Sequence, residues 1–588
     1  MTTPATQATK GGSRAVQALS RYVPSLLWLR HYQRADLPGD VMAGLIVAIM
    51  LVPQGMAYAI LAGLPPQVGL YASILPLIVY GLLGTSRALA VGPVAIVSLL
   101  VASAIGPLAG GDSALALQLA LTLALLAGVI QVGMGLLRLG FLVNFLSHPV
   151  LSGFTSAAAI VIGFSQVKTL LGVKLPSSDG FFQSVALTLE RLGETQPVTL
   201  AIGLLSIALL FYFRGGLGKH LRRLGLPNQW VTIATKSGPL MVAALGTLLV
   251  AAFDLHERAG VAIVGDVPAG LPPLSVPSFA PDVLTALLPA ALTISLVGYM
   301  ESISVAKALA SKRRQKVDAD QELVALGAAN LAAAFSSGYP VTGGFSRSSV
   351  NFSAGANSGL ASIITAGLIA LTVLLLTPTF YYLPNTVLAA IIIVAVIGLI
   401  DLHTLRHVWR YNKADAASLL VTFAAVLALG VDAGILVGVA ASIALYLWRT
   451  SRPHMAVVGR VGDSEHFRNV QRHDVQTCPH VVAVRVDESL YFANTAYLES
   501  RLLGMVAERP EVRHLLLICS AVNFIDASAL ETLEAMLHEL RDAGADLWLA
   551  EVKGPVMDRL LAIGFIDKLG HDHVFLSTHQ AMNALSCA

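Results

Sequence analysis

The chain has 588 residues, of which 55% are hydrophobic and only 12% are charged, and its mean hydropathy is +0.72. This balance excludes an ordinary soluble protein and indicates a polytopic membrane protein. The net charge is only +3 and no basic stripe with interleaved aromatic residues occurs, so nucleic acid is not an expected partner.

The N-terminal segment, residues 1–40, is expected to be cytosolic. Residues 1–20 are rich in Gln, Ser, Thr, Ala and Gly, a composition typical of disorder. Residues 22–32, which include Trp28 and Arg30, are expected to form an amphipathic segment at the membrane interface.

Apolar runs of about 20 residues then recur up to residue 448. They predict fourteen spans, the third and tenth of them short: 41–62, 67–83, 92–107, 115–139, 146–170, 198–213, 233–253, 283–309, 319–336, 345–355, 359–377, 383–401, 413–430 and 432–449.

Basic residues are distributed unevenly between the loops. If the N-terminus is cytosolic, loops after even-numbered spans carry 15 Lys and Arg residues, whereas loops on the other face carry four: Lys168, Lys174, Arg191 and Arg258. This asymmetry follows the positive-inside rule and supports both the count and the orientation. An even number of spans returns the C-terminal domain to the cytosol.

The segment GYPVTGGFSRSSVN at 338–351 interrupts the apolar pattern between the runs 325–335 and 360–377. Because it contains Pro340 and a Gly pair at 343–344, it cannot be one plain spanning helix. Irregular backbone at membrane depth must be buried in protein or line a polar cavity.

A half-helix that begins near Ser346 would direct the positive end of its dipole into that cavity, and Arg347 adds a permanent cation. Together they predict a site for an anion. The alternative is that the small residues form ordinary helix contacts and that the arginine extends to the membrane interface.

The short third span, within 86–98, also contains a Gly-Pro pair, for which a simple kinked helix is the alternative. Gln54 and Glu301 are offset by 247 positions, and Val94 and Ser346 by 252. Similar offsets suggest two halves of seven spans. Because seven is odd, the second half must be inverted, which is how many secondary transporters build a midplane site.

Glu301 lies late in an apolar run, where a carboxylate is costly unless it is paired or hydrated. It is interpreted as a proton or cation coupling site, with an ion pair to Arg347 or an interfacial position as alternatives. Gln54 follows Pro53 and can donate its amide to an anion, although an interhelical hydrogen bond is equally consistent. The sequence contains no nucleophile–base constellation, so an enzyme is not expected.

The C-terminal region alternates predicted strands and helices and is expected to form a small α/β domain. The strands are 481–486, 515–519 and 546–552, and the helices are 528–543 and 555–563. Asp526 or Ser528 is expected to cap the first of these helices.

All three cysteines, Cys478, Cys519 and Cys587, lie in this domain without CxxC or Cys/His spacing. The spacing argues against disulfides and against a metal, and no cofactor is expected. A reduced cytosolic setting fits this pattern.

Four separated motifs resemble those of the SulP sulfate permease family: VPQGMAY at 52–58, PPQVGLYAS at 65–73, GTSRALAVGPVA at 84–95 and TGGFSRSSVN at 342–351. IDASAL at 525–530 resembles a motif of the STAS domain that follows the membrane domain in this family. The match extends from about residue 30 to the end, and a bacterial inner-membrane protein is implied.

The resemblance implies a homodimer whose chains each have a membrane domain at 41–452 and a cytosolic STAS domain at 453–588. The membrane domain would comprise a core (spans 1–4 and 8–11) and a gate (spans 5–7 and 12–14), with the core moving past the gate as an elevator. Seven residues would line the anion site: Gln54, Tyr58, Val94, Ala95, Phe345, Ser346 and Arg347.

Glu301 matches a glutamate that is linked to proton coupling in the family's sulfate-transporting plant members. Ser528 matches a serine that is phosphorylated in related anti-sigma-factor antagonists. Ala527 and Ala529 replace common Ser and Gly residues there, which weakens the case for phosphate regulation or for a cytosolic partner that reads it.

The resulting prediction is a proton-coupled sulfate importer with both termini in the cytosol. Bicarbonate or dicarboxylate transport, coupled to protons or sodium, is the nearest alternative. An anion channel, or a non-transporting anion sensor or scaffold that signals through its C-terminal domain, is the alternative from another class.

Overall fold

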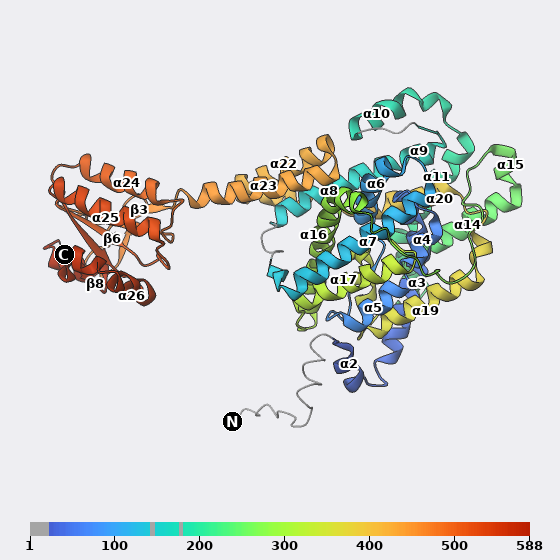
Figure 1. Ribbon diagram of the computed structural model, residues 1–588, viewed down its shortest axis with the longest axis horizontal. Helices are drawn as coiled ribbons and strands as arrows, with labels where there is room; N and C mark the ends of the chain where they lie inside the picture. The colour runs from blue at the N-terminus through green and yellow to red at the C-terminus, as the bar shows by residue number, and fades with distance from the viewer. Residues whose placement is uncertain (1–22, 142–146, 176–179, 588) are drawn as a thin grey trace. The chain divides into compact units, whose positions relative to one another are not determined.

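The computed structural model describes residues 23–141, 147–175 and 180–587. The first 22 residues of the predicted N-terminal segment, and residue 146 at the start of the fifth predicted span, lie outside the described residues. By its internal contacts the chain divides into two units, Met1–Ser442 and Ile443–Ala588, each with its own hydrophobic core (Figure 1).

The first unit is helical because its long apolar runs can satisfy their backbone polar groups only within helices at membrane depth. Each of the fourteen predicted spans coincides with one helix or with two consecutive helices. The helices up to the middle of this unit are α2 (Ser25–His31), α3 (Leu37–Leu61), α4 (Pro66–Tyr71), α5 (Leu75–Leu83), α6 (Ala95–Ala109), α7 (Ser113–Leu136), α8 (His148–Ser165), α9 (Val167–Leu171), α10 (Phe181–Glu190), α11 (Pro197–Phe211), α12 (Leu217–Arg223), α13 (Asn228–Lys236), α14 (Gly238–Phe253) and α15 (Leu255–Ala259). Those that follow are α16 (Pro281–Lys312), α17 (Ala319–Phe335), α18 (Phe345–Ser353), α19 (Leu360–Leu375), α20 (Asn385–Ile397), α21 (Leu402–Tyr411), α22 (Lys413–Leu429) and α23 (Val431–Thr450).

Within the described ranges, eight helical stretches are long and apolar enough to cross a membrane by length and composition, and a bent pair, Trp230–Lys236 with Gly238–Phe253, makes up to nine. Ala95–Ala109 and Leu360–Leu375 are shorter apolar helices. The remaining predicted spans are α17 and α22, which have 17 residues each, and α18, which has only 9.

Close approach of helices depends on glycine, as two examples show. α7 and α17 lie side by side in Figure 1, and a Cβ at Gly128 or Gly327 would meet backbone atoms of the other helix at 2.8 and 2.7 Å. A Cβ at Gly69 of α4 would lie 1.9 Å from the carbonyl oxygen of Gly55 in α3. Small residues at such contacts are how helices pack tightly in membranes.

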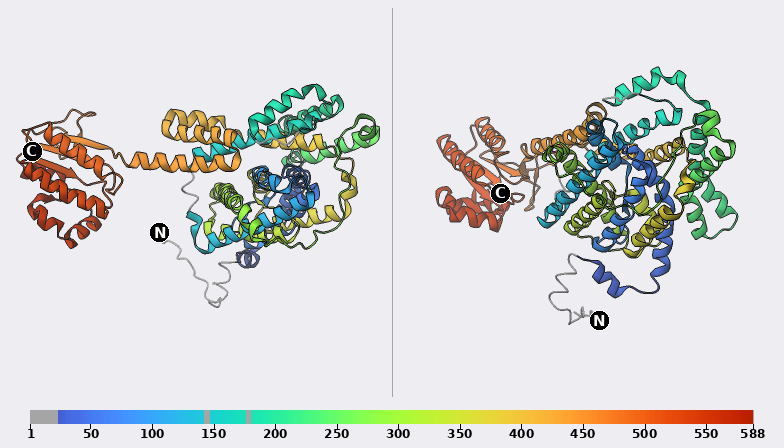
Figure 2. Two further views of the ribbon diagram at one scale, coloured as in Figure 1. Left: turned by 45° about the horizontal axis from the view of Figure 1, so that its top comes forward. Right: turned by 45° about the vertical axis from the view of Figure 1, so that its right-hand side comes forward.

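The second unit contains a six-stranded sheet in the order β4-β3-β5-β6-β7-β8. β5 to β8 are parallel, whereas β3 pairs antiparallel with both β4 and β5. The strands are β3 (Met455–Arg460), β4 (Phe467–Asn469), β5 (Val481–Val486), β6 (His514–Ile518), β7 (Asp546–Ala550) and β8 (Val574–Phe575). The strands lie together with helices packed beside them in Figure 2.

One face of this sheet is covered by α24 (Thr495–Ala507), α25 (Ala527–Asp542), α26 (Gly554–Ala562) and α27 (Phe565–Leu569), which bury the main core of the unit. The other face is covered by α28 (Thr578–Ala584). The three predicted strands and both predicted helices are present, and β3, β4, β8, α24, α27 and α28 are additional to the prediction.

The expectation that the cysteines form no disulfide is wrong. Cys478 and Cys587 are bonded, with their Cα atoms 5.6 Å apart. Cys478 precedes β5 and Cys587 follows α28, and both residues pack in the small core on the α28 face of the sheet. Sequence spacing could not reveal this pair because the two residues are separated by 109 positions and meet only when the sheet forms.

The third cysteine, Cys519, is buried and free. Burial raises the pKa of its thiol to about 12, so the thiol stays protonated and unreactive at neutral pH.

We therefore expect peptide mapping of the full-length protein, purified without reductant, to recover the Cys478 and Cys587 peptides as one linked species. Dithiothreitol should lower the melting temperature of this unit by roughly 5–10 °C, because the cross-link restricts a long loop of the unfolded chain. Cys519→Ala should leave that response unchanged. Separate peptides in the absence of reductant would contradict the assignment.

Candidate functional site

The two interrupted segments of the first unit meet at a short pair of strands. β1 (Val91–Gly92) and β2 (Thr342–Gly343) are antiparallel, with Val91 opposite Gly343 and Gly92 opposite Thr342. α6 begins at Ala95 and α18 at Phe345, each within three residues of its strand. The strand pair therefore brings the N-terminal ends of two helices together.

Neither helix start is capped by a side chain. The N-cap residues Val94 and Gly344 have extended backbones and make no side-chain cap hydrogen bond. The first amide groups of a helix have no intrahelical partner, and they carry the positive end of the helix dipole. Two such ends side by side attract an anion.

Arg347 lies at this junction and is only 3% exposed. Its Nη1 donates a hydrogen bond to the carbonyl oxygen of Pro93, which links α18 to the end of β1. Its Nε and Nη2 are buried without a hydrogen-bond partner among the described residues. A buried guanidinium with unpartnered donors is costly unless another group accepts from it, so these two nitrogens are candidate donors to an anion.

Two glycines leave room beside the free nitrogen. A Cβ at Gly92 would lie 3.3 Å from Arg347 Nη2, and a Cβ at Gly344 would lie 3.2 Å from the same atom. Gly92 has a φ of +149°, which side chains rarely adopt, whereas the backbone of Gly344 is accessible to any residue.

Polar side chains that the sequence pattern did not single out hold the strand pair in place. Ser302 Oγ accepts a hydrogen bond from the amide of Gly343 (2.8 Å), and Ser348 Oγ accepts one from the amide of Ala90 (2.9 Å). Asn351 Nδ2 donates to the carbonyl of Ala88 (3.0 Å). Backbone groups outside the helices thus form hydrogen bonds with side chains of α16 and α18.

Asn330 on α17 also binds irregular backbone, at Val341, which directly precedes β2. Its Oδ1 accepts from the amide of Val341 (2.7 Å), and its Nδ2 donates to the carbonyl of Val341 (3.1 Å) and to Gln131 Oε1 (2.9 Å). An amide side chain in an otherwise apolar run marks Asn330 in the sequence as a polar residue at membrane depth, but its partner at Val341 is set by how the helices pack.

A buried carboxylate fixes the segment that leads into β1. Glu322 is 0% exposed, and its Oε1 accepts from the amide and hydroxyl of Thr85 (2.7 and 2.6 Å) and from the amide of Ser86 (2.9 Å). Its Oε2 accepts from the hydroxyl of Tyr80 (2.7 Å). Asp40 at the start of α3 is held in the same way by donors that follow α18.

The predicted lining residues lie on three elements around this junction. Gln54 and Tyr58 are both 7% exposed and lie one turn apart on one face of α3, which packs against α6 and α18. Tyr58 is within electrostatic range of Arg347.

At the helix starts themselves the predicted residues differ in exposure. Val94 and Ala95 are each 6% exposed, whereas Phe345 is 57% exposed and Ser346 is exposed as well. The first turn of α18 therefore borders open space. The binding roles of all these residues stay predictions.

Glu301 lies on α16, directly before Ser302, and is within electrostatic range of Arg347. Its Oε2 is buried without a hydrogen-bond partner in the part of the chain that the structure describes. No ion pair joins it to Arg347 within the 4.0 Å limit among those residues, so the structure does not show the direct pair considered from the sequence.

In the second unit Asp526, rather than Ser528, caps α25 by accepting from the amide of Ala529 (2.8 Å). Its other oxygen accepts from the amide of Phe492 (2.9 Å). Ser528 is exposed in the first turn of the helix, and its regulatory role stays a prediction. Within the described residues no group of three or more His, Cys, Asp or Glu could hold a metal ion.

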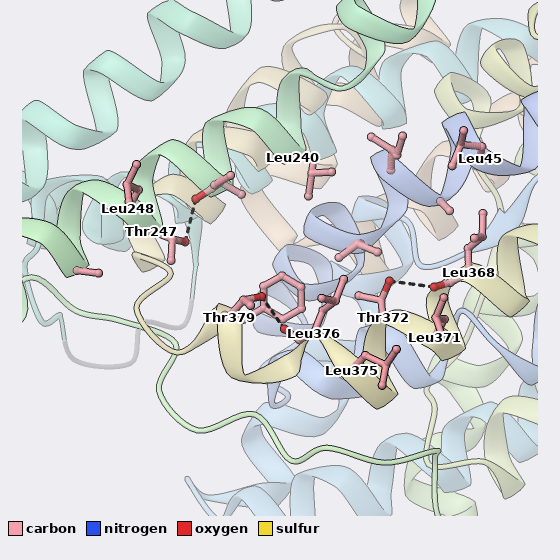
Figure 3. Close-up of a pocket in the computed structure, with 17 residues that line it drawn as sticks. Leu45, Leu240, Thr247, Leu248, Leu368, Leu371, Thr372, Leu375, Leu376 and Thr379 are labelled. Atoms are coloured by element: carbon pink, nitrogen blue, oxygen red, sulfur yellow. Dashed lines mark hydrogen bonds between the residues drawn. The ribbon is translucent and has the colours of Figure 1, made fainter.

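A cavity of about 760 Å³ lies elsewhere, between α3, α14 and the end of α19 (Figure 3). The hydroxyls of Thr247, Thr372 and Thr379 donate to carbonyls of their own helices at 2.9, 2.9 and 2.6 Å. The remaining lining residues are Leu, Ala, Ile, Val and Phe, so this cavity offers nothing that would hold an anion.

Two uncapped helix starts and a buried guanidinium with two unpartnered nitrogens, carried by a multi-pass helical unit, are consistent with a membrane transporter of anions. The chain belongs to the sulfate permease family, which it matches over residues 37–422, and it matches the STAS domain over residues 472–581. The family resemblance and the fold class predicted from the sequence are thus confirmed.

Its relatives match over nearly the whole chain. It is 37% identical over 584 residues to "Sulfate transporter 4.1, chloroplastic" of Arabidopsis thaliana, covering 97% of this chain and 83% of that protein. It is 35% identical to a "Probable sulfate transporter" of Mycobacterium tuberculosis, covering 96% and 98%.

Solved structures agree with the fold. The murine Slc26a9 anion transporter in the inward-facing state matches with a TM-score of 0.89 at 25% identity, covering 100% of this chain and 97% of that one. The transmembrane domain of the cyanobacterial bicarbonate transporter BicA matches with a TM-score of 0.58 at 22% identity, over 70% and 98%.

The space beside Arg347 gives a direct test. Gly344→Ala should weaken the binding of small inorganic anions about tenfold, roughly 1.4 kcal/mol, because the new Cβ crowds Nη2 where the anion must approach. Calorimetric titration of the purified protein with a panel of anions measures this.

Gly133→Ala in α7 is the matched control, because a Cβ there meets no atom within 4 Å. Equal affinities for both variants and the wild-type protein would show that anions bind somewhere else.

Proposed function

We propose that this protein imports sulfate together with protons. The observation that carries the proposal is the pair of unpartnered Arg347 nitrogens at the junction of two uncapped helix starts. A tetrahedral oxyanion can accept hydrogen bonds from a guanidinium fork and from helix amides at the same time. The relatives named as sulfate transporters support this choice of anion.

Coupling follows from the charge balance of the site. Inward movement of a dianion opposes the membrane potential at about 2.3 kcal/mol per charge per 100 mV, so accumulation needs a co-transported cation. Glu301 is the proposed proton carrier because its Oε2 is buried, unpartnered among the described residues and within electrostatic range of Arg347. An ionised Glu301 repels the dianion, whereas protonation removes that repulsion, so each ligand favours binding of the other.

Movement is proposed to follow an elevator path, in which spans 1–4 and 8–11 carry the site past spans 5–7 and 12–14. The cavity in Figure 3 lies at this boundary, since α3 and α19 belong to the proposed core and α14 to the proposed gate. The three threonine hydroxyls in its walls bond within their own helices, so a sliding motion would not have to break them.

The remaining assignments belong to the same proposal. Residues 1–40 form a cytosolic segment, 41–452 the transport domain and 453–588 the STAS domain, in a homodimer of the bacterial inner membrane with cytosolic termini. Ser528 is proposed as a regulatory residue because it is exposed at a helix start, and a cytosolic partner of the STAS domain is proposed as well. No catalytic role is proposed for any residue.

The test is uptake of radiolabelled sulfate into proteoliposomes that contain the purified full-length protein, with and without an inward proton gradient. We expect the gradient to stimulate uptake at least fivefold. Glu301→Gln should abolish the stimulation because a glutamine carries no titratable proton, while sulfate exchange without a gradient persists. Glu257→Gln, at an exposed position of α15, is the control and should behave as wild type.

Further outcomes separate the alternatives. Transport of bicarbonate or succinate in place of sulfate would contradict the proposed substrate but leave the proposed transporter function intact. Anion flux that depends neither on the proton gradient nor on Glu301 would indicate a channel. Bound anion without flux of any kind would indicate a sensor or scaffold.

A further inference from the structure

A short helix that the transport site does not use lines a separate cleft. α21 (Leu402–Tyr411) follows α20 after a break at 398–401 and packs against α22 and α8. Asp401 caps it by accepting from the amide and hydroxyl of Thr404 at 2.9 and 2.5 Å. The amide of Asp401 donates to Ser156 Oγ on α8 (3.1 Å), which fixes where the helix begins.

A cavity of about 350 Å³ lies between α21 and α22, and five residues line it: Leu405, Arg406, Trp409, Arg410 and Leu420. The two arginines are one turn apart on one face of α21. Both are exposed, and neither has a hydrogen-bond or ion-pair partner among the described residues. The lining of the cleft is almost entirely apolar. The two arginines therefore contribute their aliphatic stems to its walls, and their exposed guanidinium groups lie at its rim.

The surroundings of the cleft indicate a membrane interface. Trp409 is 54% exposed, and Tyr411 at the end of α21 is 86% exposed. Exposed Trp and Tyr beside basic residues on an amphipathic helix are typical of segments that lie at the headgroup level of a bilayer. The charge distribution of the loops predicts that this face is cytosolic, where anionic lipids give the membrane a negative surface.

We propose that the cleft between α21 and α22 binds the headgroup of an anionic phospholipid, with Arg406 and Arg410 holding its phosphate and Leu405, Trp409 and Leu420 contacting the start of its acyl chains. The paired arginines match a phosphate in charge and geometry. Free phosphate would make no favourable contact with the apolar walls. A lipid would contact both the arginines and these walls. The lipid would attach the segment between the twelfth and thirteenth spans to the membrane surface.

The experiment measures lipid binding to the purified full-length protein in an uncharged detergent by native mass spectrometry. The probes are phosphatidylglycerol and phosphatidylcholine with the same acyl chains. We expect the wild-type protein to bind one phosphatidylglycerol molecule per chain about 10- to 30-fold more tightly than phosphatidylcholine, because each basic residue near the phosphate contributes a factor of roughly five. The double variant Arg406→Gln, Arg410→Gln should lose that preference.

Arg222→Gln with Arg223→Gln on α12 is the matched control, because it removes two exposed arginines from the same predicted face without touching the cleft. It should keep the preference. Leu420→Asn should weaken the binding of both lipids, because it places a polar group in the apolar wall. Both cleft arginines are exposed and unpartnered among the described residues, so the double variant should keep the wild-type melting temperature.

Three results would overturn the proposal. The first is an unchanged lipid preference in the Arg406 and Arg410 variant. The second is an equal loss in the α12 control, which would show a general effect of charge. The third is competition by millimolar inorganic phosphate that removes the bound lipid signal, which would make the cleft a site for free phosphate.

Discussion

The structure of the membrane unit depends on one constraint: the backbone that interrupts two helices at membrane depth must find hydrogen-bond partners inside the protein. The antiparallel pair of β1 and β2 satisfies part of this need, and Ser302, Ser348 and Asn330 satisfy much of the rest. Because the partners come from other helices, the two helix starts are held in a fixed relation. The proposed anion site is a consequence of the way these backbone groups find their partners.

The buried charged side chains of the membrane unit differ in how fully they are hydrogen-bonded. Glu322 and Asp40 are fully buried carboxylates, and each is satisfied by several neutral donors from segments that flank the broken helices. They act as fixed anchors. Arg347 and Glu301 instead retain buried atoms without a partner among the described residues. Unsatisfied polar atoms are costly, so these two residues differ from the carboxylates that support the fold, and this difference is why they carry the proposed binding and coupling roles.

The sequence predicted the spans and the two breaks because apolar runs, glycine and proline have local structural effects. It singled out Arg347 as a candidate because a permanent cation within a broken span is costly unless an anion or a polar cavity compensates it. It could not predict Asn330 or Glu322 as supports, because their partners at Val341 and Thr85 are set by how helices pack. The pairing of Cys478 with Cys587 was missed because it depends on the sheet and on α28, which packs against one of its faces.

The central claim is that Arg347 supplies the charge that holds the anion, and sulfate affinity of the purified protein tests it most directly. Binding of radiolabelled sulfate would be compared among the wild-type protein, Arg347→Lys and Arg347→Gln, with melting temperatures to verify folding. We predict a loss of at least about 100-fold for the glutamine variant, and a smaller loss for lysine, which keeps the charge but not the fork. A folded glutamine variant that binds sulfate within about threefold of wild type would contradict the claim.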